Sequence, residues 1–152
     1  MNTLLAPTIG IDLTEEQRAV QAAARDFAQN ELLPGVIERD EEARFPAGQV
    51  RRMGELGFLG MMVSPEYGGS GLDTISYVLA MEEICKVDAS CGVIMSVNNS
   101  LVCWGLEQFG TEAQKQKYLT RLATGESIGA FCLSEPEAGS DATSQHSTAQ
   151  DM

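Results

Sequence analysis

The residues from Phe131 to Asp141 carry the side chains best suited to bind a small molecule. They read Phe-Cys-Leu-Ser-Glu-Pro-Glu-Ala-Gly-Ser-Asp, so a short apolar run opens into a turn rich in hydroxyl and carboxylate groups. Ser134 offers a hydroxyl and an amide, and Gly139 permits a close approach of the backbone. Ser140 and the aspartate after it can cap a turn or hold a polar ligand group. A strand end of this composition can hold a flat cofactor with polar edges.

Other chemistries fit this run less well. An elaborate turn whose side chains satisfy one another is the simplest alternative. Neither Ser134 nor Ser140 has a histidine nearby, which argues against a serine nucleophile. Glu135 and Glu137 flank a proline with no evident substrate, so they do not indicate a pair of glycosidase acids. Four cysteines without C-x-x-C spacing and a single histidine argue against a zinc site, and free buried thiols are expected.

A second group of polar residues lies within an apolar stretch. The run from Met95 to Leu101 reads Met-Ser-Val-Asn-Asn-Ser-Leu. Buried amides and hydroxyls must be hydrogen-bonded, so these residues could join one helix to another. They could equally line a ligand cavity through Met95, Ser96 and Asn99, because ligand pockets are apolar with few polar groups. Both readings stay open. The loop Gly68-Gly69-Ser70-Gly71 lacks the lysine of a P-loop and reads as a tight turn.

The elements that must position these groups are helices. Capping boxes at Thr14 and Thr111 open two helices, and Asp73 and Asp88 can cap two more. Pro46 suits the first turn of another helix. The helix after Asp88 is apolar nearly all round through Trp104, which predicts a place in the centre of a bundle.

The pattern changes after Gly125. The apolar run 128–133, bounded by turn signals, predicts a strand. We therefore expect a mainly α protein: a helical bundle domain over residues 1–124, then the first strand of an incomplete β domain over residues 125–152. A lone strand of this kind is poorly stable, which indicates a piece of a longer protein.

Composition narrows the function classes. The chain has 152 residues, of which 43% are hydrophobic and 21% charged, as in ordinary globular proteins. A net charge of −12 argues against nucleic acid and anionic membranes as partners. Asp88, Asn98 and Asn99 interrupt the longest apolar run, so we expect no membrane span. The first seventeen residues contain no Lys or Arg, which argues against a leader and predicts a cytoplasmic protein.

The run FCLSEPEAGSDATS resembles the first signature of the acyl-CoA dehydrogenase family. Its small, aliphatic, hydroxyl and acidic positions are all filled, by Cys132, Leu133, Ser134, Glu135, Ala138, Gly139, Ser140, Asp141 and Ser144. The segments PEYGGSGLD and EQFGTEAQKQKYL are similar to the same family's N-terminal helical domain. The stretch GVIMSVNNSL looks most like the short-chain (butyryl-CoA) branch. The resemblance covers the chain from Leu13 onward.

The resemblance implies an FAD enzyme that oxidises a short-chain acyl-CoA to the trans-2-enoyl-CoA, with an electron-transfer flavoprotein as electron acceptor and a homotetrameric full-length protein. It implies that Ser134 bonds the flavin edge, that Ser140 also contacts the acyl-CoA, and that Met95, Ser96 and Asn99 neighbour the acyl pocket. The residues it places along the flavin are Phe131, Cys132, Leu133, Ser134, Glu135, Pro136, Glu137, Ala138, Gly139 and Ser140.

The sequence also departs from the family pattern. In the family, a catalytic glutamate lies in a later helical domain, and a Trp-Ile-Thr segment completes the flavin site. No acid in this chain matches that base. We therefore expect an N-terminal fragment that is inactive by itself. The alternatives are a non-catalytic helical binding or assembly module, and an acyl-CoA oxidase or a relative that acts on branched substrates.

Overall fold

Helices make up most of the chain between Thr14 and Thr124 in the computed structural model, which describes residues 12–150. Residues 1–11 and 151–152, and with them part of the leader prediction, lie outside the described residues. The α-helices are α1 (Glu15–Phe27), α2 (Val36–Glu41), α3 (Ala47–Glu55), α4 (Thr74–Cys85), α5 (Ala89–Ser96), α6 (Trp104–Phe109), α7 (Glu112–Gln114) and α8 (Thr120–Ala123). Wider π-helical turns continue three of them, at Ala28–Leu32, Val97–Cys103 and Lys115–Leu119. Short 3-10 turns lie at Pro65–Tyr67 and Ala142–Ser144.

Four of the predicted helix starts are confirmed. Gln17 N donates to Thr14 Oγ1 at 3.1 Å, and the Gln17 side chain accepts from the Thr14 N–H in return. Thr111 forms the same capping box at α7. Asp73 caps α4 and Asp88 caps α5 through their carboxylates. Each cap satisfies an N–H group that the first turn of a helix leaves without a partner.

Two local predictions were incomplete or displaced. The sequence predicted no helix between Pro34 and Pro46, but residues 36–41 form the short helix α2, which starts after Gly35 in a left-handed conformation (φ +74°). Pro46 precedes the first turn of α3 as its N-cap residue, rather than lying inside it.

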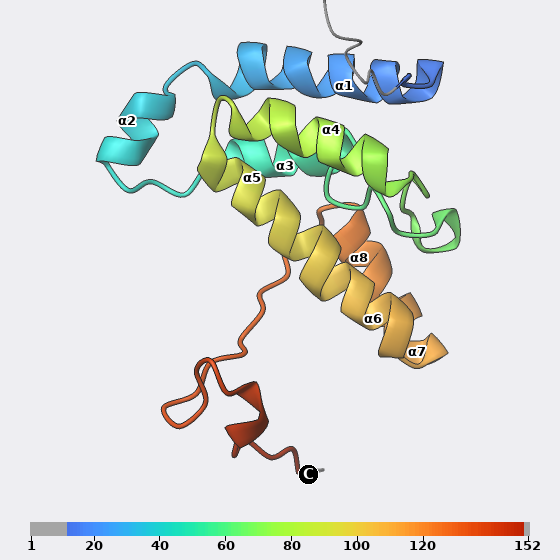
Figure 1. The fold of residues 1–152 in the computed structure, drawn as a ribbon, viewed down its shortest axis with the longest axis vertical. Helices are drawn as coiled ribbons and strands as arrows, with labels where there is room; N and C mark the ends of the chain where they lie inside the picture. Colours follow the sequence, from blue (N-terminus) through green and yellow to red (C-terminus); the bar gives the residue numbers. More distant parts are fainter. Residues whose placement is uncertain (1–11, 151–152) are drawn as a thin grey trace, which may run out of the picture.

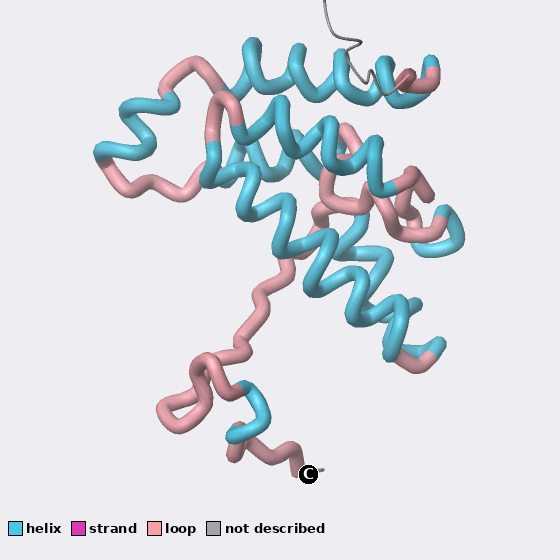
Figure 2. The backbone as a smooth tube through the Cα atoms, viewed as in Figure 1, coloured by secondary structure: helices cyan, strands magenta, loops and turns pink. Residues whose placement is uncertain are grey.

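The helices pack around one main core. Figure 1 shows α1 lying along α4 and the α5–α6 helix crossing below them, while α3, partly hidden behind α4, contacts α5. Leu32, Met53, Leu59, Ile84 and Met95 are each fully buried where these elements meet. Figure 2 shows the same backbone as a smooth tube, in which the long loop between α3 and α4 is interrupted by one 3-10 turn. Burial of this apolar surface is the main force that stabilises the domain.

A buried carboxylate ties α1 to α4. Glu83 accepts hydrogen bonds from Arg25 Nη2 at 3.0 Å and from Gln21 Nε2 at 3.2 Å. Gln17 Nε2 donates to Asp73 Oδ2 at the other end of the same pair of helices. These polar contacts join α1 and α4 near both ends of the pair.

The helix from Ala89 to Phe109 is continuous through α5, the π-helical turn and α6. It is long enough and apolar enough to cross a membrane by length and composition, although core helices of water-soluble proteins pass the same test. Its place in a bundle centre was predicted, but the described residues cover only one side: Val93, Leu101 and Trp104 are between 42% and 61% exposed. The covered side carries Met95, the two asparagines and Cys103.

The strand predicted for residues 128–133 was wrong. In the part of the chain that the structure describes, this segment is extended but belongs to no sheet, and the one β-bridge pairs Glu135 with Ala138. An extended run becomes a strand only when a neighbouring backbone pairs with it, and here the described chain offers none. Figure 1 shows the segment leaving the helices and continuing to the C-terminal turns.

Candidate functional site

The segment that carries the predicted site residues begins at the long helix. Gly129 N donates to Asn98 Oδ1 at 2.9 Å. A Cβ atom at Gly129 would lie 2.7 Å from Val102 Cγ1, closer than real side chains come. Only glycine therefore fits where the segment crosses the helix.

Asn98 itself is completely buried. Its Nδ2 donates to the carbonyl of Leu59 at 2.8 Å and to that of Leu122 at 3.1 Å. Asn98 thus links the long helix to three other parts of the chain: the loop after α3, the end of α8 and the start of the segment at Gly129. Buried amides that use all their donors and acceptors in this way stabilise a unique arrangement.

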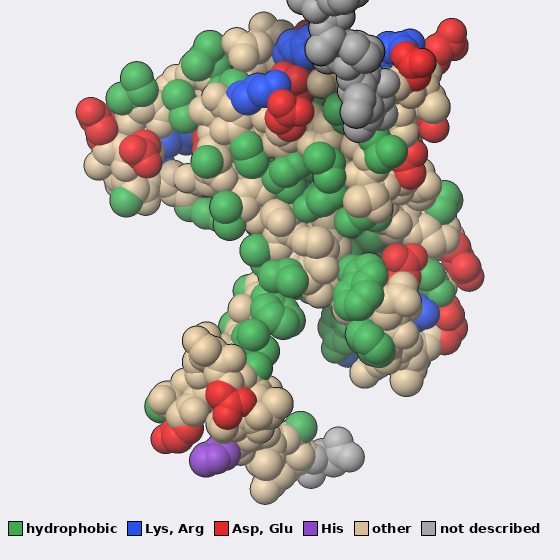
Figure 3. All heavy atoms as spheres, viewed as in Figure 1, with side chains coloured by type: hydrophobic (Ala, Val, Ile, Leu, Met, Phe, Trp, Pro, Cys, Tyr) green, Lys and Arg blue, Asp and Glu red, His purple; other side chains and the backbone are tan. Residues whose placement is uncertain are grey.

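The middle of the segment is exposed and has unused donors. Phe131, Cys132, Leu133 and Ser134 are all exposed, and within the described residues their backbone N–H groups donate no hydrogen bond. The Ser134 hydroxyl likewise has no partner among the described residues. Phe131 is 51% and Leu133 is 40% exposed, so apolar side chains are accessible beside these donors. Figure 3 shows hydrophobic side chains along this part of the chain, next to the helical domain.

The carboxylates of the run are occupied by the chain itself. Glu135 and Ala138 exchange two backbone hydrogen bonds around a tight turn at Pro136 and Glu137. The Glu135 carboxylate accepts from the backbone N–H of Ser147 and, at 2.7 Å, from that of His146, and these bonds lower its pKa. Glu135 therefore stays ionised and acts as a clamp on the chain that follows.

Asp141 has a similar local role. It caps the turn Ala142–Ser144, where the hydroxyl groups of Thr143 and Ser144 donate to its carboxylate and lower its pKa. The carboxylates of Glu135 and Asp141 therefore match the simplest alternative, a turn whose side chains satisfy the hydrogen-bonding groups of the chain itself. Ser140 and Gly139 are exposed, and nothing lies within 4 Å of the position of a Cβ on Gly139.

The donors present fit one edge of a flavin. A flat heterocycle with polar edges needs apolar contacts for its faces and N–H or O–H donors for its carbonyl oxygens and ring nitrogens. Phe131 and Leu133 offer the apolar contacts. Ser134 and the neighbouring backbone N–H groups offer the hydrogen-bond donors. The fit extends to the exposed residues 131–134, 139 and 140. It does not extend to the carboxylates of Glu135 and Asp141, which already accept internal bonds.

The second predicted group lies on the long helix. Met95 is fully buried in the main core. Asn99 Oδ1 accepts from Met61 N at 2.9 Å, and Asn99 Nδ2 donates to the carbonyls of Phe58 and Met95. Of the two readings, helix-to-loop hydrogen bonding describes Asn99 as it stands. Ser96 is half-buried, and Ser100 donates to its carbonyl at 2.7 Å. A pocket role for these three residues stays a prediction.

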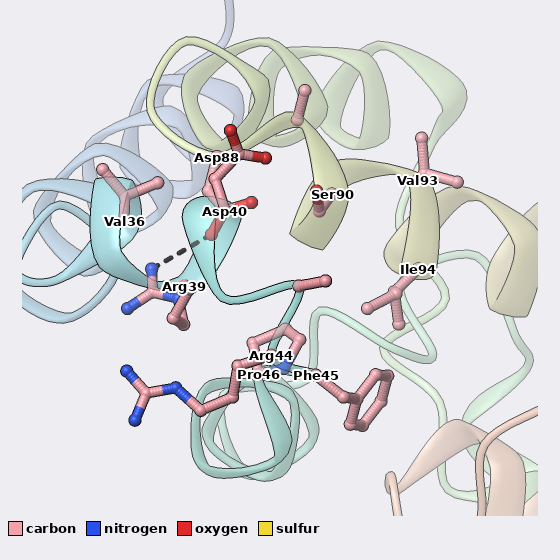
Figure 4. A pocket seen from close by; sticks show the side chains of 12 residues that line it. Val36, Arg39, Asp40, Arg44, Phe45, Pro46, Asp88, Ser90, Val93 and Ile94 are labelled. Atoms are coloured by element: carbon pink, nitrogen blue, oxygen red, sulfur yellow. Dashed lines mark hydrogen bonds and ion pairs between the residues drawn. The ribbon is translucent and has the colours of Figure 1, made fainter.

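A cavity of about 690 Å³ lies elsewhere, between α2, the loop before α3 and the start of α5. Figure 4 shows Arg39, Asp40 and Asp88 at one end and Phe45, Val93 and Ile94 toward the other. Burial raises the pKa of Asp88, but hydrogen bonds from Cys91 and Arg39 outweigh this and hold its pKa below the ordinary value. The predicted site residues do not line this cavity.

Sequence reasoning missed Asn98 and Gly129 as the residues that attach the segment to the helix. The asparagine pair was noted, but both members are polar residues in the same apolar run, and sequence gives no reason to choose Asn98. The signal for Gly129 was weaker still, because a glycine in an apolar run also fits a bulge.

Comparisons with known proteins identify the family and the fold. The family model described as "Acyl-CoA dehydrogenase, N-terminal domain" matches residues 14–126. A relative from Clostridium acetobutylicum, "Acyl-CoA dehydrogenase, short-chain specific", is 48% identical over 138 residues, which are 91% of this chain. This chain spans only 36% of that relative's length.

Two solved structures share the fold. Butyryl-CoA dehydrogenase from Megasphaera elsdenii superposes with a TM-score of 0.84 at 40% identity, over 91% of this chain and 37% of that one. A structure described as the electron transferring flavoprotein of Acidaminococcus fermentans, in work on flavin-based electron bifurcation, superposes with a TM-score of 0.86 at 46% identity, over 90% of this chain and 36% of that one. With the family model covering most of its residues and the helical fold shared, this chain belongs to the acyl-CoA dehydrogenase family, whose N-terminal domain it carries.

Proposed function

We propose that the protein containing these residues is an FAD-dependent acyl-CoA dehydrogenase that oxidises a short-chain acyl-CoA to the trans-2-enoyl-CoA. The observation that carries the proposal is the exposed segment 131–134, with its unused donors, attached to a helical domain of this family. The short-chain preference is supported by the relative from Clostridium acetobutylicum and the butyryl-CoA dehydrogenase structure.

Different residues of the segment 131–140 are proposed to make different contacts with FAD and the acyl-CoA. Phe131 and Leu133 offer apolar contact to a ring, and Ser134 donates to its polar edge. Donors held in place before the reaction stabilise negative charge that develops on a bound group. The chemistry supplied by bound FAD is acceptance of the β-hydrogen of the thioester as a hydride. Ser140 is proposed to contact the acyl-CoA. Glu135 and Asp141 hold the turns of the chain on either side of it.

The acyl group is proposed to lie toward Ser96, the half-buried member of the predicted pocket group. Met95 and Asn99 would then form the wall behind it, since both are buried. In this arrangement Asn99 keeps its hydrogen bonds to the loop 58–61 and acts on the pocket through its shape.

The proposed partners follow from the family. An electron-transfer flavoprotein is the proposed electron acceptor, a proposal supported by the similarity to the Acidaminococcus structure. A homotetramer, a location in the cytoplasm, the lack of a membrane association, and a domain boundary near residue 124 also remain predictions.

The test is flavin reduction by substrate. The complete polypeptide that carries these residues, loaded with FAD and mixed with butyryl-CoA, should lose its flavin absorbance within a catalytic turnover. The 152-residue chain with excess FAD should not, because none of its carboxylates matches the family base. No bleaching by the complete polypeptide with acyl-CoAs of any short chain length would overturn the proposal. Rapid reoxidation by oxygen would instead indicate an acyl-CoA oxidase.

A second function is supported by the exposed apolar surface. Phe109 is 80% exposed and packs edge-on against Trp104, which is 51% exposed. Surface aromatic pairs of this kind favour protein contacts. We propose a non-catalytic assembly module as the alternative. Light scattering of the 152-residue chain separates the two, since a monodisperse monomer would count against assembly.

A further inference from the structure

Asn98 joins three stretches of chain that are far apart in sequence. Its amide donates to Leu59 and Leu122 and accepts from Gly129, and it is completely buried. We propose that Asn98 is a positioning residue that holds the start of the cofactor-binding segment against the helix carrying Ser96. The inference rests on the proposed function, because it takes residues 131–140 to be that segment.

The neighbouring asparagine shows that this role is specific. Asn99 is as deeply buried as Asn98 and bonds to Met61, Phe58 and Met95. All of these contacts lie inside the helical domain. Only Asn98 of the pair reaches beyond residue 125, so the two side chains differ in whether they hold the segment.

Steric fit at Gly129 supports the same anchor. The hypothetical Cβ of Gly129 would meet Val102 at 2.7 to 2.8 Å from three of its side-chain atoms. Val102 lies on the helix one turn after Asn98, so the hydrogen bond and the close contact act on the same point of the segment. A larger residue at position 129 would push the segment away from the helix while leaving the helical core intact.

An anchor here would prepare the site before the cofactor binds. Ser134 follows Gly129 by only five residues. A fixed Gly129 therefore limits how far the Ser134 donors can move from the helix. Ordering a mobile segment opposes binding, and a segment that is already attached has less freedom to lose. Asn98 would therefore affect cofactor affinity without touching the cofactor.

The experiment uses the complete polypeptide and two matched pairs of variants. Asn98→Ala is compared with Asn99→Ala by hydrogen exchange of the Gly129 amide, which donates to Asn98, without FAD. We expect exchange about tenfold faster in Asn98→Ala than in Asn99→Ala, as for the loss of one hydrogen bond. Equal exchange in the two variants would overturn the proposal.

The second pair tests the cofactor and also covers the case in which Asn98→Ala does not fold. Gly129→Ala is compared with Gly105→Ala, a helix glycine with nothing within 4 Å of its Cβ position. FAD dissociation constants are measured by quenching of flavin fluorescence. Gly129→Ala should weaken FAD binding about tenfold and speed exchange of the amide at position 129 relative to its unprotected rate, because the anchor is lost. Gly105→Ala should change neither quantity.

The outcomes separate the two proposals. If Gly129→Ala binds FAD as tightly as Gly105→Ala does, the positioning role is wrong even though the wild-type protein binds FAD. If the wild-type polypeptide binds no FAD, the proposed function is wrong. The exchange comparison then still decides whether Asn98 holds the segment.

Discussion

Arg39 and Asp88 form an ion pair of 3.0 Å although each side chain is less than one-tenth exposed. Arg39 also donates to the carbonyls of Leu32 and Pro34, and Asp88 caps the first turn of α5 through Cys91 N. The pair therefore connects α2 and the end of the first helix to the start of the long helix. Its two charges are stable in the interior only because each compensates the other.

Replacing Arg39 should lower the free energy of unfolding, because Asp88 would lose its counter-charge. Arg39→Met leaves the Asp88 carboxylate buried without its counter-charge, which costs about 3–5 kcal/mol in similar cases. Urea denaturation monitored by circular dichroism measures the free energy of unfolding. The control is Arg44→Met, which removes an exposed pair with Glu38 and should cost at most about 1 kcal/mol. Similar losses in the two variants would contradict a special role for the buried pair.

Acid should destabilise the domain through Asp88 and Glu83. Hydrogen bonds from Arg25 lower the pKa of Glu83, and the pKa of Asp88 is lowered as described above. A carboxylate with a lowered pKa in the folded state contributes stability above its unfolded pKa of about 4 and loses it as pH falls through the folded pKa. Thermal unfolding between neutral pH and about pH 2 should show a falling midpoint. Asp88→Asn should make this fall shallower, and an unchanged slope would contradict the assignment.

Gly54 should not tolerate even alanine. A Cβ there would lie 2.7 Å from the carbonyl oxygen of Thr124 and 2.8 Å from Gly125 Cα, and backbone atoms cannot rotate away. Gly54→Ala should cost about 1–3 kcal/mol through forced displacement of α3 from the end of α8. Gly48 lies on the same helix, is exposed and has nothing within 4 Å, so Gly48→Ala should be neutral or stabilise by up to about 1 kcal/mol. Chemical denaturation of both variants tests the contrast.

Ser134→Ala should weaken flavin binding without affecting the fold. The Ser134 hydroxyl is exposed and has no hydrogen-bond partner among the described residues, so stability should change by less than about 0.5 kcal/mol. Loss of one hydrogen bond to the cofactor should raise the FAD dissociation constant about five- to tenfold in the complete polypeptide. Ser127→Ala, outside the proposed site, is the control for fluorescence titration. Equal affinities in the two variants would remove Ser134 from the site.

Local sequence determined where four of the helices begin. Thr14 with Gln17, Asp73 and Asp88 cap helices as predicted, because a capping side chain bonds to backbone N–H groups two or three residues away. The family resemblance also came from contiguous residues, since its signature is read within the fourteen positions 131–144 of the chain. Interactions of this range require no knowledge of the rest of the fold.

Tertiary structure decided which polar residues remain available to a ligand. The sequence did not show that Asn99 is committed to the loop 58–61, that Glu135 clamps the chain at His146, or that Asn98 rather than its neighbour meets Gly129. It also predicted a strand where the described chain forms none, because an apolar run does not reveal whether a partner backbone lies beside it. The sequence specifies which donors and acceptors each side chain has. Whether they already have partners depends on groups that only folding brings within hydrogen-bond distance.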